Sequence, residues 1–313
     1  MCIFSQPVTS VSRTRIFARK SSVLAQFLVY QMNYDSPQAT AMILPIPVKQ
    51  PAQDRSFRFV DLKQYPNFFD DLARGFPFNS GASFSIGCSL PSDPLAEKKL
   101  KIFEVGSYVA SFVPTLQDFS RLDERFRLPD ALSSTSSLYQ NFSFAVFQLA
   151  EGSLEPHPMA FEFETSNSGL FFPTLHIHDG TIQPEEEFDH ALYLQHAGFD
   201  SQVYGYRNND FEDTATRWIR SKYTADCFCR CADTDGLVKQ NLLVHRKLIV
   251  GKHTNQDTVV ELFGDSQTPE LNLRPLLNSV INLPWWFFWC AVVWIFLRRD
   301  RVKRDAQTKQ KPA

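Results

Sequence analysis

The sequence lacks several features that would assign it to a well-known functional class. Its 32 lysines and arginines face 34 aspartates and glutamates, so it has no basic surplus for binding nucleic acid. It has only 12 glycines, and neither a P-loop nor a Gly-x-Gly-x-x-Gly motif, which argues against phosphate binding by a glycine-rich turn. The six cysteines are scattered, unlike those of a secreted disulfide scaffold, and we expect free thiols in a reducing compartment.

Short stretches of alternating apolar and polar residues dominate a chain that is 43% hydrophobic and 21% charged, the composition of a folded protein. In residues 26–34 one strand face carries Leu28, Tyr30, Met32 and Tyr34. Further strands are expected at residues 14–19, 40–44, 57–61, 101–105, 108–113, 142–149, 159–164, 170–178, 188–196, 225–231 and 242–250. Helical spacing is limited to residues 66–74 and 115–125. The pattern predicts a β-rich α+β fold with mostly antiparallel sheets and a few short helices, plus a C-terminal hydrophobic helix.

The expected strands divide at a polar loop, residues 133–137. We interpret residues 1–132 as an N-terminal β-rich half and residues 138–275 as a C-terminal β-rich half. No repeat of fixed period separates them, so we expect the two halves to form one continuous globular unit.

The carboxyl end carries the longest apolar run of the chain. Residues 283–297 contain no charge and include four tryptophans, and starting at residue 280 lengthens the run to eighteen residues. Fifteen helical residues reach about 22 Å, less than the ~30 Å of a hydrocarbon core, so residues 280–297 are interpreted as a transmembrane or interfacial helix. A buried helix packed on the globular domain is the alternative.

The membrane arrangement follows from the flanking charges. Residues 298–313 form a basic tail with seven basic and two acidic residues, which favours a cytoplasmic tail end. Residues 1–30 show no apolar core of a signal peptide. We therefore expect a single C-terminal span with the globular part in the cytoplasm; either the tail crosses against its charge preference, or the segment does not cross fully.

Two sets of residues could carry chemistry, the first at the amino terminus. Removal of Met1 would leave Cys2 with a thiol and a free α-amine, which can serve as the general base for that thiol. The order of Cys2 and Arg19 resembles the start of an N-terminal-nucleophile amide hydrolase, in which Cys2 and Arg19 would be catalytic. The alternative is that residue 2 is simply a small apolar residue at the start of a strand.

The second set is a histidine cluster. Five of the seven histidines lie within forty residues: His157, His176, His178, His190 and His196. On a strand His176 and His178 share a face, and His190 or Asp179 could complete a three-ligand site for a divalent metal such as zinc or iron. The alternative is that these histidines are surface polar groups beside a turn.

A third pattern, Cys227-x-Cys229-x-Cys231, would place three sulfurs along one strand face about 6.8 Å apart. One zinc ion needs its sulfurs closer together than that. We therefore expect a half-buried strand that uses cysteine as a small hydrophobic residue.

The first seventy-five residues contain, in this order, Cys2, the pair Pro7 and Val8, the Arg15-Ile16-Phe17 strand and the Leu44-Pro45-Ile46-Pro47 block. This ordered set resembles a bacterial family known only as a domain of unknown function. It implies a C-terminal apolar helix followed by arginines, and it implies no activity.

No pattern is specific enough to define an active site. We therefore expect a non-enzymatic, membrane-associated binding or assembly domain, whose partners are the membrane, through residues 280–297, and a protein or small molecule, but not nucleic acid. The alternatives are an amide hydrolase that uses Cys2, or a metal-dependent enzyme that uses His176, His178 and His190.

Overall fold

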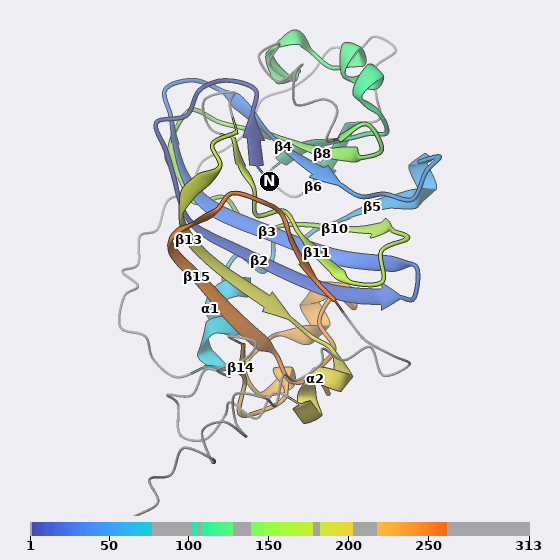
Figure 1. Cartoon of the computed structure of the whole chain (residues 1–313), viewed down its shortest axis with the longest axis vertical. Helices are drawn as coiled ribbons and strands as arrows, with labels where there is room; N and C mark the ends of the chain where they lie inside the picture. Colours follow the sequence, from blue (N-terminus) through green and yellow to red (C-terminus); the bar gives the residue numbers. More distant parts are fainter. Residues whose placement is uncertain are drawn as a thin grey trace, which may run out of the picture. The chain divides into compact units, whose positions relative to one another are not determined.

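The computed structural model describes residues 2–76, 102–105, 108–127, 139–177, 182–202 and 218–261. Most of the strands in these ranges belong to two large β-sheets (Figure 1). Sheet A has the order β12 (His176–Ile177), β1 (Cys2–Phe4), β4 (Thr40–Ile46), β8 (Ser143–Leu149), β7 (Tyr108–Val113), β6 (Ile102–Val105). Sheet B has the order β14 (Ile219–Arg220), β15 (His245–Thr254), β13 (Glu185–Leu194), β2 (Ser10–Ser22), β3 (Ala25–Ser36), β10 (Met159–Glu164), β5 (Phe57–Val60), and β9 (Gly152–Leu154) also pairs with β3.

The remaining elements are short. β11 (Leu170–Phe172) and β16 (Thr258–Val260) form a two-stranded sheet. The α-helices are α1 (Phe68–Arg74) and α2 (Ala197–Gln202). Short 3₁₀-helices are η1 (Asp54–Ser56), η2 (Leu116–Arg121), η3 (Glu124–Phe126), η5 (Ala225–Cys227) and η6 (Cys231–Thr234).

The predicted fold class is confirmed for the described residues: the protein is β-rich, its strand pairs are mostly antiparallel, and its helices are few and short. Parallel pairing occurs between β1 and β12 and between β2 and β13. The expected C-terminal helix, residues 280–297, lies outside the described residues. Within the described ranges no helix combines the length and hydropathy needed to cross a membrane.

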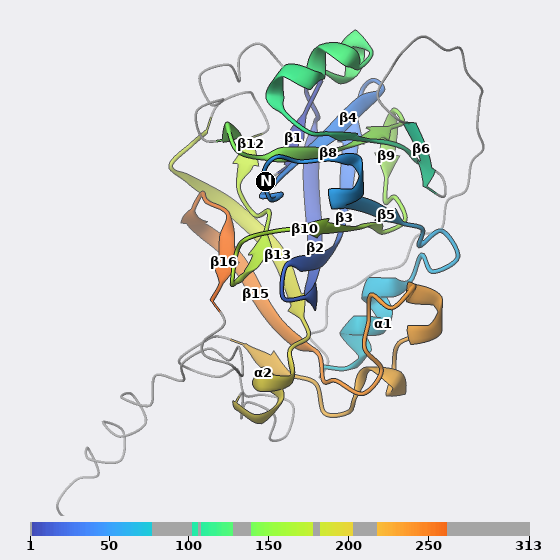
Figure 2. The ribbon, with the colours of Figure 1, turned by 90° about the vertical axis from the view of Figure 1, so that its right-hand side faces the viewer.

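Apolar layers cover both faces of both sheets. The inner faces pack on one another, with Leu28 and Tyr30 of sheet B against Met42 and Phe147 of sheet A. The outer face of sheet A packs on η2 and η3, and the outer face of sheet B packs on α1 and residues 225–244 (Figures 1 and 2). Leu28, Tyr30, Met32 and Tyr34 all face the central core, as the alternation predicts.

The chain switches between the sheets early. β1 and β4 are neighbours in sheet A, whereas β2 and β3 between them form a long hairpin in sheet B. The first fifty residues therefore contribute strands to both large sheets. Both large sheets combine strands from before and after residues 133–137, because β4 pairs with β8 and β3 pairs with β10.

Three local predictions were wrong. The strand expected at residues 225–231 is replaced by η5 and the start of η6, and the α-helix expected at residues 115–125 is replaced by η2 and η3. β4 also continues through Pro45 to Ile46. Proline is tolerated there because β1 pairs only with Met42 and Ile43, so no partner on that side needs the missing N–H. Within the strand expected at residues 170–178, residues 170–172 form β11 and residues 176–177 form β12, and residue 178 lies outside the described residues.

Gly169 tests the attachment of β16 to β11. A Cβ at this position would lie 2.8 Å from the Val260 carbonyl oxygen and 2.8 Å from Val259 Cγ1. Because a backbone oxygen cannot rotate away, we expect Gly169→Ala to lower the free energy of unfolding by about 1–3 kcal/mol. Urea denaturation checks this, with Ser168→Ala as the neighbouring control. Equal stability of the two variants would show that β16 does not pack against Gly169.

Candidate functional site

Arg19, the predicted partner of Cys2, is a buried part of the scaffold. Its Nε donates to the Leu237 carbonyl at 2.7 Å, and its Nη2 donates to the Gly236 carbonyl. The guanidinium lies 5.1 Å from the centre of the Phe27 ring. Burial lowers the pKa of Arg19 to about 10, although Glu162 acts in the opposite direction. The arginine thus anchors the turn at residues 236–237 to sheet B.

The structure does not bring Arg19 and Cys2 together. Ile16 and Ala18 face the central core, so Arg19, at the alternate position, lies on the outer face of sheet B. Cys2 belongs to β1 in sheet A, where its Cα pairs with that of His176. The side chain of Cys2 is not among the described atoms, so its role stays a prediction.

His176 and His190 are brought together although they lie on different sheets. Their Nε2 atoms are 2.7 Å apart, and the side chains are buried, with residue exposures of 7% and 1%. The ring of Phe188 stacks on His176 at 4.6 Å and meets His190 edge-on at 4.9 Å. A hydrogen bond between the two imidazoles therefore joins β12 to β13, and the ring of Phe188 packs against both histidines.

The amide of Asn255 holds β12 in place beside this pair. Its Oδ1 accepts a hydrogen bond from the His176 N–H at 2.7 Å, and its Nδ2 donates to the His176 carbonyl at 2.9 Å. One side chain thus satisfies both backbone groups of His176, as a neighbouring strand would.

The geometry of the histidine pair is that of a hydrogen bond. Two ligands of tetrahedral zinc would place their nitrogens about 3.3 Å apart at the usual Zn–N distance. Among the described residues no group of three or more His, Cys, Asp or Glu side chains gathers as a metal site would require. His178, the third predicted ligand, lies outside them, so the three-histidine site stays a prediction and no metal chemistry is derived from it.

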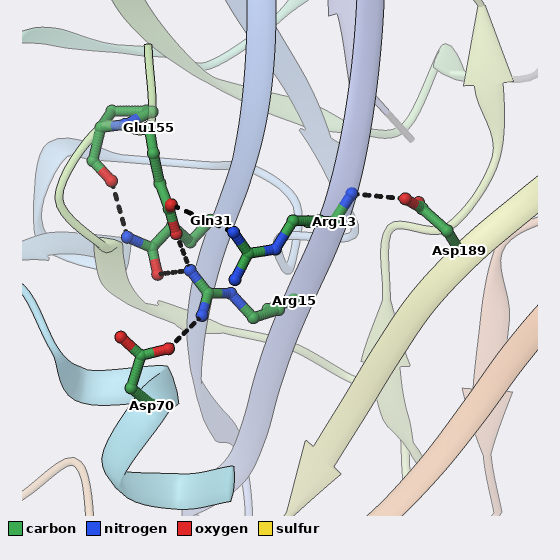
Figure 3. Close-up of polar contacts among 7 residues, drawn as sticks. Arg13, Arg15, Gln31, Asp70, Glu155 and Asp189 are labelled. Atoms are coloured by element: carbon green, nitrogen blue, oxygen red, sulfur yellow. Dashed lines mark hydrogen bonds and ion pairs between the residues drawn. The ribbon is translucent and has the colours of Figure 1, made fainter. Parts of the chain in front are cut away.

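A further charged group, Arg15, which the sequence did not single out as a site residue, bonds to side chains of three segments (Figure 3). Its guanidinium donates to Asp70 of α1 at 2.8 Å, to Gln31 of β3 at 2.9 Å, and to Glu155. It also lies 5.4 Å from the Phe69 ring centre. Gln31 in turn donates to the Pro156 carbonyl at 2.7 Å. This cluster joins β2, β3, α1 and the segment between β9 and β10.

Arg13 lies beside this cluster and is more exposed. Its backbone has a φ of 53° within the bulge of β2, and its N–H donates to the Asp189 carboxylate of β13. Its guanidinium approaches Glu155 only to 3.7 Å. The signal for both arginines was the alternation of Arg13, Arg15, Phe17 and Arg19, which places charges on a face that also carries a core phenylalanine. Their carboxylate partners lie 55 or more residues away in sequence and could not be found from it.

The three clustered cysteines do not share a strand face. Cys227 is exposed, Cys229 is buried and Cys231 is intermediate. Burial raises the pKa of the Cys229 thiol, and the nearby Cys231 and Asp71 act in the same direction. Tyr65 donates a hydrogen bond to Asp71 at 2.8 Å and accepts one from the Arg230 N–H at 2.9 Å. Cys229 therefore serves as the small buried residue expected, but in a 3₁₀ layer on sheet B.

Arg15 is expected to stabilise the fold more than its neighbour Arg13. Arg15→Ala leaves Asp70, Glu155 and Gln31 without their common donor, and we expect a loss of about 2 kcal/mol, reduced from the fully buried case because both carboxylates are partly exposed. Arg13→Ala is the matched control, expected to cost less than about 0.5 kcal/mol. Chemical denaturation of both variants measures the difference, and equal losses would contradict the assignment.

Buried phenols and the buried thiol predict loss of stability at alkaline pH. Burial raises the pKa of Tyr34 to about 12 and raises the pKa values of Tyr108, Tyr193 and Cys229 as well. The unfolded chain releases these protons from about pH 9 upward while the folded chain keeps them, so the free energy of unfolding should fall above about pH 9. Urea denaturation between pH 8 and pH 11 measures the fall.

A spectroscopic titration provides the check on this prediction. Phenolate absorbance of the native protein should lag behind that of the protein in concentrated urea. Complete ionisation of all tyrosines near pH 10 without unfolding would contradict the burial of these phenols.

No protein-family model matches the chain, and the solved structures that are similar to it share little sequence identity. The crystal structure of baculovirus P35 is similar at 12% identity with a TM-score of 0.39, covering 84% of this chain and 98% of that one. A mutated baculovirus P35 after caspase cleavage gives 12% identity and a TM-score of 0.40 over 80% and 99%, and the caspase-8/P35 complex gives 12% and 0.39 over 80% and 95%. Similarity at this level identifies neither a shared fold nor a shared function.

Proposed function

We propose that the β-rich part of the chain is a non-enzymatic binding or assembly domain, held at a membrane by residues 280–297. Its partner is a protein or a small molecule and not nucleic acid, and the globular part faces the cytoplasm. The apolar carboxyl-terminal run supports the membrane attachment. The hydrogen bonds of the buried polar groups independently support the non-enzymatic role.

The hydrogen bonds of the buried polar side chains support the proposal of a non-enzymatic domain. Arg19 bonds to backbone carbonyls, His176 and His190 bond to each other, and Arg15 bonds to side chains of three separate segments. Each of these groups joins layers of the scaffold. A partner would then bind at the surface of the domain, where apolar side chains such as Val23 and Val250 are 74% and 67% exposed.

The membrane part of the proposal rests on residue chemistry. An uncharged run with four tryptophans, followed by a basic tail, suits the apolar interior and the anionic surface of a bilayer. Attachment by one such segment would leave the β-rich part free to bind a partner beside the membrane.

Charge substitution in the full chain tests the attachment. Val292→Asp combined with Val293→Asp should cost roughly 5–7 kcal/mol of insertion free energy, at ~2.5–3.5 kcal/mol per charge. We expect the unchanged protein in the carbonate-resistant pellet of membranes and the double variant in the supernatant. Gln307→Asp with Gln310→Asp, outside the apolar run, is the control and should stay in the pellet. Recovery of the unchanged protein in the supernatant would contradict the proposal.

A further inference from the structure

The turn between β2 and β3 carries two adjacent apolar residues that face solvent. Ser22 pairs with Ala25, so Val23 and Leu24 form the two-residue loop of this hairpin, and the loop lies at one end of sheet B (Figure 1). Val23 is 74% exposed, more than any other large apolar residue in the described ranges, and Leu24 is 54% exposed. Loops of this kind usually carry glycine, asparagine or aspartate. The geometry of the turn therefore does not explain why both residues are apolar.

The backbone of the turn is held by neighbouring groups of the protein. The Leu24 carbonyl accepts a hydrogen bond from the Thr165 N–H at 2.8 Å, and the Leu24 N–H donates to Ser22 Oγ at 3.3 Å. The Lys20 ammonium donates to the Asn167 carbonyl. Both backbone polar groups of Leu24 thus have partners within the protein, so moving this residue out of water leaves neither of them unsatisfied.

The described chain ends beside the same turn. The segment of residues 165–170, which bonds to the turn through Thr165, also contacts the last described residues. Ser168 Oγ lies 3.5 Å from Glu261 Oε2, and Leu170 pairs with Val260 of β16. Eighteen residues, 262–279, then lead to the apolar run, and a fully extended segment of that length spans at most ~60 Å. The connection to the run therefore begins at the end of sheet B that carries the apolar turn.

Val250, the other strongly exposed valine, lies at the opposite end of sheet B. It pairs with Asp189, whose carboxylate accepts a hydrogen bond from the Arg13 N–H near the start of β2. Arg13 precedes Ser22 by nine residues along β2, which corresponds to roughly 30 Å at the rise of a β-strand. The two valines thus mark opposite ends of the sheet, and only Val23 lies beside the exit of the chain.

The charges around the turn indicate an apolar contact instead of an electrostatic one. Residues 21–26 carry no charge. Lys20 precedes them, Glu164 pairs with Ala25, and Glu261 follows β16. One cation beside two anions forms no basic surface for anionic lipids. A contact of this turn with a bilayer would therefore involve the apolar side of the interface and would not require negatively charged headgroups.

We propose that Val23 and Leu24 insert into the interface of the bilayer that residues 280–297 enter, so that the β-rich part faces the membrane with this end of sheet B. Two side chains are too few to hold a protein at a membrane, so the turn acts together with the run, as a second point of contact that orients the domain. This inference rests on the proposed membrane attachment and deepens it.

Photo-crosslinking of the full chain in lipid vesicles tests the proposal. The photoreactive residue p-benzoylphenylalanine replaces Val23 or, as the matched control, Val250, in vesicles of phosphatidylcholine with tritium-labelled acyl chains. We expect at least about five-fold more lipid bound at position 23 than at position 250, because burial of apolar side chains holds the turn in the interface. Replacing part of the lipid by phosphatidylserine should leave the yield unchanged, and a several-fold rise would contradict an apolar contact.

A second substitution shows whether the apolar pair itself makes the contact. Leu24→Asp, combined with the photoreactive residue at position 23, should lower the lipid yield at least about five-fold, because a charge opposes insertion. Leu154→Asp is the control, because Leu154 is 39% exposed and pairs with Tyr34, at the other end of β3. Its lipid yield should equal that of the unchanged turn. Circular dichroism shows that each variant is folded before it is used.

Failure of this inference can be told apart from failure of the proposed attachment, because flotation of the vesicles reports attachment separately. Protein that floats but binds lipid equally from both positions, or from neither, overturns the contact of the turn and keeps the attachment. Crosslinking of position 23 to protein instead of lipid has the same meaning, since the turn would then bind a protein partner. Protein that does not float contradicts the attachment and the contact of the turn together.

Discussion

The structure depends on the burial of sheet B on both of its faces. Its central hairpin, β2 and β3, presents Ile16, Leu28 and Tyr30 to the core shared with sheet A and Phe17 and Val29 to the layer formed by α1 and residues 225–244. Burying apolar area on two faces of the same strands gives a large hydrophobic gain per residue. It also excludes most of the solvent from the charged side chains of this hairpin. Its arginines therefore need hydrogen-bond partners within the protein.

Charged side chains in such a layer need partners, because an unpaired buried charge is very unfavourable. Arg15 finds carboxylates on α1 and on the segment before β10, and Arg19 finds the carbonyls of residues 236–237. Each interaction joins a segment distant in sequence to the same strand. The hydrogen bonds of these arginines therefore hold the outer layer on sheet B.

The histidine pair does the same between the two sheets. One hydrogen bond between His176 and His190 joins β12 to β13, and Asn255 fixes the backbone of β12 beside it. We therefore propose that binding is a property of the surface of the β-rich part, and membrane attachment a property of the carboxyl-terminal run.

The sequence by itself determined the β-rich class and the face of β3 that enters the core, because alternation reports which side of a strand is apolar. It also showed that the six cysteines are scattered along the chain. Only the tertiary structure decided that residues 225–227 and 231–234 form 3₁₀-helices, and that Arg15 and the pair of His176 with His190 bond within the scaffold. Such contacts join residues far apart along the chain, and local propensity carries no information about which distant strands become neighbours.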